Sequence, residues 1–152
     1  MDNTPDMDKD QMLFDRIASD ELASAVEKRA EPFTPSANGI LFREGDDPDG
    51  VYFLKTGKVT LTMHTAGKTV ISISVAAGSL LGLPAIMGNK PYTLTATTVG
   101  QAEVYKIIHD DFKQMIVQER LCLDVLRILA GEVNSARATL GKSLSQQAQT
   151  MS

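Results

Sequence analysis

Short stretches of apolar or alternating residues, separated by glycine, proline, asparagine and aspartate, fill the chain from Glu31 to Ile108. The stretches are Glu31 to Thr34, Ile40 to Phe42, Val51 to Leu54, Lys58 to His64, Thr69 to Val75, Tyr92 to Thr98 and Glu103 to Ile108. Each is short and bounded by turn-forming residues, which is typical of a strand. Many short strands in succession predict a β-sandwich or jelly roll.

Two of the predicted strands indicate which of their faces is buried. Apolar residues alternate with polar ones at Val59, Leu61 and Met63 in the first strand, and at Ile71, Ile73 and Val75 in the second. Successive side chains on a strand point to opposite faces, so each strand has one face towards water. Thr65-Ala66-Gly67 lies between them and is expected to form a hairpin connection, because Gly67 can adopt a positive φ. The two strands are then antiparallel neighbours.

Helical patterns precede the β region. Gln11 to Ala18 and Ser19 to Arg29 are both predicted to be helices, and Ser19 is suited to cap the second. The polar residues 1–10 are expected to be disordered. With 152 residues, 43% of them hydrophobic, the chain is long enough for one ordinary domain. We place this domain at residues 11–141, followed by a polar tail at residues 142–152.

Helical periodicity returns after the last predicted strand. Asp110 or Asp111 is expected to cap a short helix over Phe112 to Gln118. After a break near Glu119, a longer helix is expected from Leu121 to at least Leu140.

A seam of apolar and small residues follows the longer helix. Its members step by four and three residues: Cys122, Leu126, Leu129, Val133, Ala136, Leu140 and Ser143. This spacing keeps them on one face of a helix for three heptads. The seam either docks on the β domain or forms a two-chain coiled coil, and Cys122 is expected to be a packed thiol within it. Because the β domain is too short to cover the whole seam, we predict a parallel homodimer centred on Leu126, Leu129, Val133 and Leu140.

Charge and composition exclude several classes of protein. The net charge is −4 and no run is rich in lysine or arginine, so we expect no binding to duplex DNA by this chain itself. The polar tail after the long helix also leaves no room for a helix-turn-helix. No apolar stretch reaches the ~18 residues of a membrane span, and the acidic N-terminus is unlike a secretory signal. Together with the single cysteine, Cys122, these features predict a cytoplasmic protein that contacts no membrane.

The strand-rich pattern is interrupted at Gly82. Gly82 can adopt a positive φ or let a ligand approach closely, and the residues from Leu83 to Met87 are enough for about one helical turn. The first N-H groups of such a turn can bind an anion, although Pro84 removes one donor. A plain turn between two strands explains the same residues equally well.

The segment Leu41 to Gly57, LFREGDDPDGVYFLKTG, resembles the first signature of cyclic-nucleotide-binding domains of the catabolite activator protein type. The matching features are an apolar pair, the step Gly45-Asp46, the apolar run Val51 to Leu54 and the closing Gly57, while Phe42 and Pro48 depart from the usual residues. The order of elements also matches, from about Leu13 to Leu140. The resemblance implies a mainly β fold with flanking helices: a β-roll (double-stranded jelly roll) with a short internal helix and a long C-terminal helix.

The second signature of that family, which holds its ligand, is altered in this chain. The resemblance places Gly82 where the family has its glycine, but Leu83 where a glutamate contacts the ribose and Tyr92 where an arginine contacts the cyclic phosphate. Leu94 stands in place of an alanine, and Thr93 is the polar phosphate contact that remains. With Ala85 in the internal helix and Thr139, the nearest candidate for a base contact, these are the candidate ligand-binding residues.

The loss of two charged contacts can be expressed as an affinity. A hydrogen bond to a charged group contributes about 1.5 to 3 kcal/mol, so losing two costs roughly two to four decades in affinity. Cyclic AMP and cyclic GMP are therefore not expected to bind tightly. Two hypotheses remain: a regulatory domain that senses a cyclic nucleotide or another small molecule and acts on a protein partner, or a structural or protein-interaction module that has lost its ligand.

Other candidate sites are weaker. His64 could be a haem ligand, since some sensors of this superfamily bind haem through a histidine of the β-roll, but a solvated hairpin histidine explains it better. Asp46, Asp47 and Asp49 lack the spacing of a calcium loop, so turn chemistry explains them better. Neither His64 nor His109 lies in a recognisable acid-base motif, and we therefore predict no enzyme activity, no metal site and no certain cofactor.

Overall fold

The structure of the chain, a computed structural model, describes residues 16–132. Its elements are α2 (Asp20–Arg29), β1 (Glu31–Phe33), β2 (Ile40–Phe42), β3 (Gly50–Thr65), β4 (Lys68–Ala76), β5 (Leu80–Leu81), α3 (Leu83–Gly88), β6 (Thr95–Ile108) and α4 (His109–Gln118). Residues 122–132 form a further helix, named here the C-terminal helix. The predictions for residues 1–15, Val133, Ala136, Thr139, Leu140, Ser143 and the tail lie outside the described residues.

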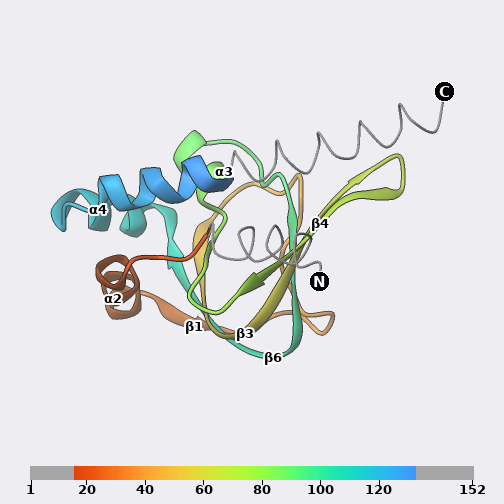
Figure 1. The fold of residues 1–152 in the computed structure, drawn as a ribbon, viewed down its shortest axis with the longest axis horizontal. Coiled ribbons are helices and arrows are strands. Elements are labelled where there is room, and N and C mark those ends of the chain that lie inside the picture. Colours follow the sequence, from red (N-terminus) through yellow and green to blue (C-terminus); the bar gives the residue numbers. More distant parts are fainter. Residues whose placement is uncertain (1–15, 133–152) are drawn as a thin grey trace, which may run out of the picture.

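One antiparallel sheet forms the body of the molecule (Figure 1). Its two long strands, β3 and β6, pair along most of their length, from Gly50 opposite Ile108 to Thr62 opposite Thr95. β1 and β2 pair with β6, whereas β4 and β5 pair with β3. The predicted class, mainly β with flanking helices and a short internal helix, is confirmed.

Each long strand replaces two strands that the sequence pattern predicted. β3 continues through Gly57, where the register against β6 shifts and the backbone has a φ of 96°. A Cβ atom at Gly57 would lie 2.7 Å from the Cβ of Ala102 on the neighbouring chain segment. Glycine therefore allows a bulge in a continuous strand here, whereas the sequence pattern alone suggested a break.

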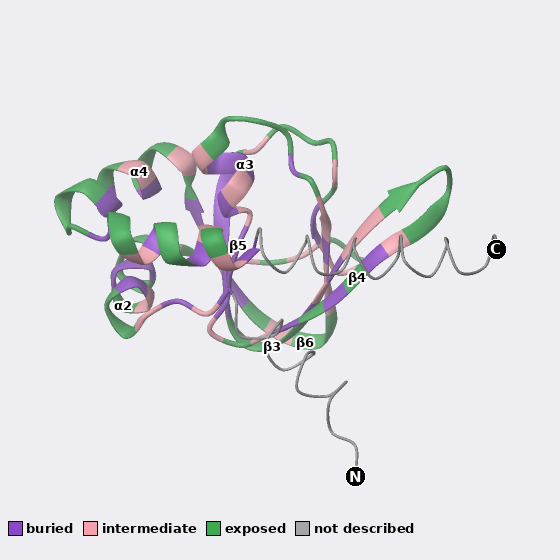
Figure 2. Ribbon diagram, turned by 45° about the horizontal axis from the view of Figure 1, so that its top comes forward, coloured by how far each residue is buried: buried purple, intermediate pink, exposed green. Residues whose placement is uncertain are grey.

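The hairpin between β3 and β4 is confirmed. Thr65 pairs with Lys68, and the two residues between them, Ala66 and Gly67, have φ values of 54° and 79°. Positive φ at both central residues is the geometry that continues the twist of an antiparallel pair. In both strands the predicted apolar face is the less exposed one (Figure 2).

Two clusters of buried side chains form the core. One lies among the helices and the adjoining end of the sheet, and the other lies within the curve of the sheet itself. Leu83 belongs to the first cluster, while Ala85 and Tyr92 belong to the second. The turn at Gly82 and the helix α3 therefore stand where the two clusters meet, as their position between helices and strands in Figure 1 also indicates.

The N-terminal prediction is correct for α2 and wrong for residues 16–18, the described part of the helix predicted over Gln11 to Ala18. Ser19 caps α2 as expected, since its hydroxyl accepts a hydrogen bond from the Leu22 N-H at 3.2 Å. Residues 16–18, however, are extended rather than helical and pair with residues 78–80. This pairing satisfies backbone groups that a helix would otherwise have satisfied internally.

The predicted cap of α4 is wrong. The helix begins at His109, its N-cap is Ile108, and no side chain caps it. Asp110 and Asp111 lie within its first turn, where a carboxylate still interacts favourably with the positive end of the helix.

The C-terminal helix docks by a face different from the predicted seam. Its buried face begins at Leu121 just before the helix and continues with Val125 and Ile128. The seam lies about a quarter-turn away, given about 100° per residue. Leu126 is 56% exposed, while Leu129 is partly buried against the helical cluster. The described part of the seam is therefore not the docking face.

Cys122 corrects another prediction. Its residue is exposed rather than packed within this chain. The thiol lies 3.8 Å from the carbonyl oxygen of Ile116, at the start of the C-terminal helix. Cys122 is exposed because it lies on the seam, about 100° round the helix from the buried docking face of Leu121, Val125 and Ile128.

Candidate ligand pocket

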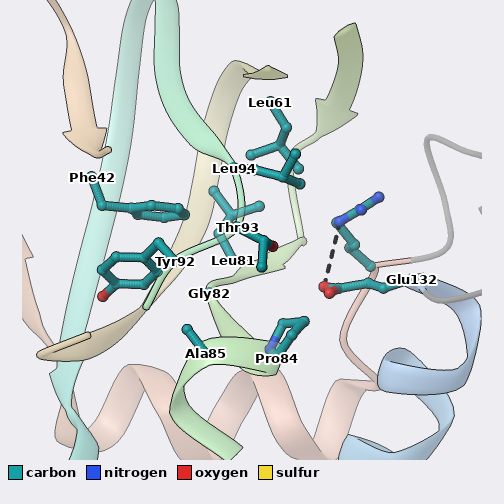
Figure 3. A pocket seen from close by; sticks show the side chains of 11 residues that line it. Phe42, Leu61, Leu81, Gly82, Pro84, Ala85, Tyr92, Thr93, Leu94 and Glu132 are labelled. Carbon is teal, nitrogen blue, oxygen red and sulfur yellow. Dashed lines mark ion pairs between the residues drawn. The ribbon is translucent and has the colours of Figure 1, made fainter. Parts of the chain in front are cut away.

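A small pocket opens between the turn at Gly82, the loop before β6 and the C-terminal helix (Figure 3). Its lining residues are Arg16, Phe42, Leu61, Leu81, Gly82, Pro84, Ala85, Tyr92, Thr93, Leu94 and Glu132. The cavity measures about 30 Å³. A single water needs roughly 10 to 15 Å³ by the same measure, so the cavity has room for about two waters.

Most of the residues predicted to bind a ligand lie together at this pocket. Gly82, Ala85, Tyr92, Thr93 and Leu94 all line it. Tyr92, Thr93 and Leu94 were predicted to begin a strand, and this prediction is wrong, because β6 begins at Thr95. They instead form a loop that crosses the pocket, as Figure 3 shows for Tyr92, Thr93 and Leu94.

Leu83 does not line the pocket. Its side chain is fully buried in the helical cluster, on the other side of α3. Leu83 is the first residue of α3 and directly follows Gly82, whose φ is 90°. The position that the resemblance assigned to the ribose contact therefore serves the core in this chain, and Thr139 lies outside the described residues.

Gly82 is required by space as well as by backbone conformation. A φ of 90° is a region that side chains with a Cβ rarely adopt. A Cβ atom here would also come within 3.0 Å of Cε1 in the Tyr92 ring. Gly82 thus lets the tyrosine ring pack directly against the turn at the start of α3.

Tyr92 is buried, and both its ring and its hydroxyl make specific contacts. The ring stacks on Phe42 with centroids 4.1 Å apart. The hydroxyl donates a hydrogen bond to the Gly50 carbonyl at 2.8 Å and lies 3.2 Å from a carboxylate oxygen of Asp49. The residue is 4% exposed, so it is held in place by packing and by hydrogen bonds at once.

Ionisable groups beside Tyr92 have shifted pKa values. Burial raises the pKa of Tyr92 and of Tyr52, and the nearby Asp49 carboxylate raises both further. For Asp49 itself, burial raises the pKa, but the hydrogen bond and charge of Lys106 outweigh burial and hold that pKa below its usual value. The Lys106 ammonium lies 2.6 Å from Asp49. The two tyrosines therefore stay neutral while Asp49 stays charged over the ordinary pH range.

Two charged residues that the sequence pattern did not single out also line the pocket. Arg16 and Glu132 form an ion pair, with Nε 3.4 Å from Oε1 and side-chain exposures of 3% and 8% (Figure 3). Arg16 comes from the extended segment before α2, and Glu132 comes from the C-terminal helix. Their partnership spans most of the described chain, so no local pattern could have identified it.

The pocket and its fold can be compared with known proteins. The family model described as "Cyclic nucleotide-binding domain" matches residues 35–119. The chain belongs to the cyclic nucleotide-binding domain family. The family is one of regulatory sensor domains that are typically non-catalytic. The match includes the pocket segments around Gly82 and Tyr92 but excludes Arg16 and Glu132.

Individual relatives share the domain but are longer proteins. The chain is 28% identical over 123 residues to potassium channel KAT3 of Oryza sativa subsp. japonica, and the match covers 80% of this chain and 24% of that protein. The catabolite activator protein of Thermus thermophilus is 22% identical with a TM-score of 0.58, covering 91% of this chain and 63% of that chain. The regulatory domain of Toxoplasma gondii PKA, solved with cAMP, is 20% identical with a TM-score of 0.56, and the match covers 76% of this chain and 46% of that chain.

This chain matches only part of each of these relatives. The chain spans about a quarter of the curated channel and under two thirds of the catabolite activator protein. At these identities the solved structures support the β-roll fold, and what each relative binds belongs to that relative. Within residues 16–132, no helix is long and apolar enough to cross a membrane.

His64 and Asp49, the weaker candidates for a metal or haem site, each lie in an ion pair with one neighbouring side chain. The Nδ1 atom of His64 lies 3.2 Å from a carboxylate oxygen of Glu44 at the exposed hairpin end. Asp49 pairs with Lys106, as described above. Over the described range, no group of three or more His, Cys, Asp or Glu side chains is placed to hold a metal ion.

Proposed function

We propose that the chain is a regulatory ligand-sensing domain whose phosphate-binding segment is degenerate and which signals through its C-terminal helix. The supporting observation is Tyr92, whose ring and hydroxyl fill the position where the family resemblance expects an arginine. A tyrosine hydroxyl bonded to a backbone carbonyl supplies no positive charge to a cyclic phosphate. The pocket then favours a ligand that contacts apolar walls.

A second function is favoured by the size of the cavity. About 30 Å³ holds no nucleotide without rearrangement. A structural or protein-interaction module that has kept the fold and lost its ligand would have a pocket filled in this way by Phe42 and Tyr92. Both functions use the same fold and differ in whether a small molecule binds.

Calorimetry with cyclic AMP and cyclic GMP tests the degenerate segment. We expect no binding of either nucleotide at micromolar concentration, because two charged contacts are missing at Leu83 and Tyr92. A dissociation constant in the low micromolar range for either nucleotide would contradict the proposal. A thermal-shift screen with apolar small molecules separates the two functions, since a ligand at about 100 times its dissociation constant stabilises by roughly 2.7 kcal/mol.

The proposal extends to partners and location. The exposed seam at Leu126 supports a homodimer through the C-terminal helix, to which an unidentified protein partner could couple. We place the domain in the cytoplasm and expect no binding to duplex DNA by this chain, because its net charge is −4. A gel shift with mixed-sequence duplex at physiological salt tests the last point, and retention of the DNA by the protein would overturn it.

A further inference from the structure

Arg16 brings a buried positive charge to the pocket wall. Its backbone carbonyl accepts a hydrogen bond from the Leu80 N-H at 2.9 Å, and Ala18 N-H donates to the Gly78 carbonyl at 2.9 Å. Ile17 forms an isolated bridge with Ser79 between these two bonds. The segment is thereby fixed beside β5, which leads directly into Gly82.

The guanidinium of Arg16 has unused hydrogen-bonding capacity. It carries five N-H donors, and Nε faces Glu132 at 3.4 Å. Its Nη1 atom is buried with no hydrogen-bond partner within the described part of the chain. Because the side chain is only 3% exposed, water does not readily replace that partner.

We propose that this pocket takes a small organic anion, either a carboxylate or a phosphate ester with a short apolar body, which binds Arg16 in competition with Glu132. This inference rests on the proposed ligand-sensing function and names its ligand class. A guanidinium binds carboxylate and phosphate oxygens through two parallel N-H donors, a geometry that its contact with Glu132 through Nε does not use.

The other walls of the pocket select the rest of the ligand. Phe42, Leu61, Leu81 and Leu94 present apolar surface, and Thr93 adds a hydroxyl. Charge is thus concentrated at one end of the pocket, at Arg16 and Glu132, and the opposite wall at Tyr92 carries none (Figure 3). A short ligand with one anionic end and one apolar end complements this arrangement, and because the cavity is only about 30 Å³, the ligand is compact and its anionic end takes the place that the Glu132 carboxylate occupies beside Arg16.

Competition for Arg16 would couple the ligand to the C-terminal helix. Glu132 lies on that helix, while Val125 and Ile128 on the preceding turns dock into the core. An anion that takes Arg16 removes the ion pair that joins the helix to residues 16–18. Ligand binding then changes how firmly the helix end is held, which is a regulatory output.

The test is a titration of the full chain, followed by NMR amide shifts of Thr93 and Leu94. The probes are butyrate, butyl phosphate and uncharged butyramide at constant ionic strength. We expect one or both anions to perturb the pocket, with butyramide binding weakly or not at all. Glu132→Gln should tighten anion binding by roughly tenfold, the factor that corresponds to one hydrogen bond to a charged group.

Two surface variants provide matched controls. Glu27→Gln changes the net charge by the same amount as Glu132→Gln, but its partner Lys55 lies on the surface, so anion affinity should not change. Arg16→Gln should abolish anion binding, whereas Arg127→Gln, at a side chain 66% exposed, should not. If Arg16→Gln does not fold, the comparison of Glu132→Gln with Glu27→Gln still tests whether the anion competes with Glu132 for Arg16.

Several results would overturn the anion site. They are equal tightening by Glu27→Gln and Glu132→Gln, unchanged binding in folded Arg16→Gln, and no response to either anion in the unmodified chain and in Glu132→Gln. Equal binding of butyramide and butyrate would reject the role of Arg16 while supporting a ligand pocket. Failure of the anion site alone therefore leaves the ligand-sensing function to the screen described above.

Discussion

At the scale of single residues, Tyr92 changes the chemistry of the pocket most. A flexible cation at this position would reach a ligand, whereas the tyrosine is fixed by Phe42 on its face and by the Gly50 carbonyl at its hydroxyl. A Cβ atom at position 82 would come to 3.0 Å from its ring, so the two positions constrain each other. One aromatic residue thus fills this part of the pocket wall without supplying a positive charge.

Gly82→Ala tests this mutual constraint, with Gly45→Ala as its control. Both glycines have φ values near 90°, so both variants carry the same backbone strain, of order 1 to 3 kcal/mol. A Cβ at Gly45 meets nothing within 4 Å, whereas one at Gly82 meets the Tyr92 ring at 3.0 Å. We expect Gly82→Ala to lose more unfolding free energy in urea than Gly45→Ala, and equal losses would reject a clash with Tyr92.

Tyr92→Phe tests the buried hydroxyl. The variant keeps the ring but leaves the Gly50 carbonyl without this donor, so unfolding free energy should fall by about 1 to 3 kcal/mol. Tyr105→Phe, at a less buried tyrosine, should change it by about 0.5 kcal/mol or less. A loss at Tyr105 as large as at Tyr92 would show that the Tyr92 hydroxyl has no special role.

The same tyrosine predicts a pH dependence. Burial raises the pKa of Tyr92 and Tyr52 in the folded protein above the value of about 10 expected when unfolded. Stability from these groups is therefore complete below about pH 10 and is lost as pH rises further, because the unfolded state releases protons first. Urea unfolding across this range should show a decline that is smaller in Tyr92→Phe, and an equal decline would contradict the assignment.

The residues of the pocket were only partly predictable. Gly82, Tyr92 and Thr93 stand in a recognisable segment, and the positive φ at Gly82 follows from the break in the strand pattern. Leu83 was assigned to the pocket by position alone, but its side chain is buried in the helical core. Arg16 and Glu132 meet only in the folded chain, so their pairing could not be read from either segment.

At the scale of elements, local sequence patterns predicted the type of each element better than the residues at which it begins and ends. The alternation in β3 and β4 and the hairpin residues Ala66 and Gly67 were sufficient to predict an antiparallel pair. Residues 55–57 were predicted to separate two strands, but Gly57 accommodates a bulge against Ala102 within one longer strand. The same residue type can therefore break a strand or let it continue, depending on how closely another segment approaches.

The C-terminal helix has two apolar faces, and sequence periodicity could not show which of them packs against the core. Ile128, 1% exposed, packs in the helical cluster, whereas Leu126 is 56% exposed. Ile128→Ala should lower the unfolding free energy by about 2 to 5 kcal/mol, because it removes buried methylenes and leaves a cavity.

Leu126→Ala provides the comparison for that helix. It should cost about 0.5 kcal/mol or less at a protein concentration low enough to keep the chain monomeric. Urea unfolding measures both variants. Equal costs would mean that the helix does not dock by the face containing Ile128.

At the scale of the whole molecule, the exposed side of the C-terminal helix predicts an assembly. Leu126 lies on the seam, and Leu123, 80% exposed, lies three residues before it, about 60° round the helix at the flank of the seam. Neither is covered by the docking face of the helix. A partner helix that covers the seam would bury Leu126 and the half-buried Leu129 while leaving Leu123 at the edge of the contact, where its end still reaches water.

We therefore predict a parallel homodimer that Leu126→Asp disrupts and Leu123→Asp leaves intact. Both variants replace an exposed leucine on one helix with the same charge, so solubility and net charge change equally. In the dimer, an aspartate at Leu126 would be desolvated without a partner, whereas one at Leu123 would remain hydrated. Light scattering at tens of micromolar should give a dimer for the unmodified chain and for Leu123→Asp, and a folded monomer for Leu126→Asp. A monomer for the unmodified chain would mean that the seam has no second helix to cover it, and equal disruption by both variants would mean that the contact is not the seam.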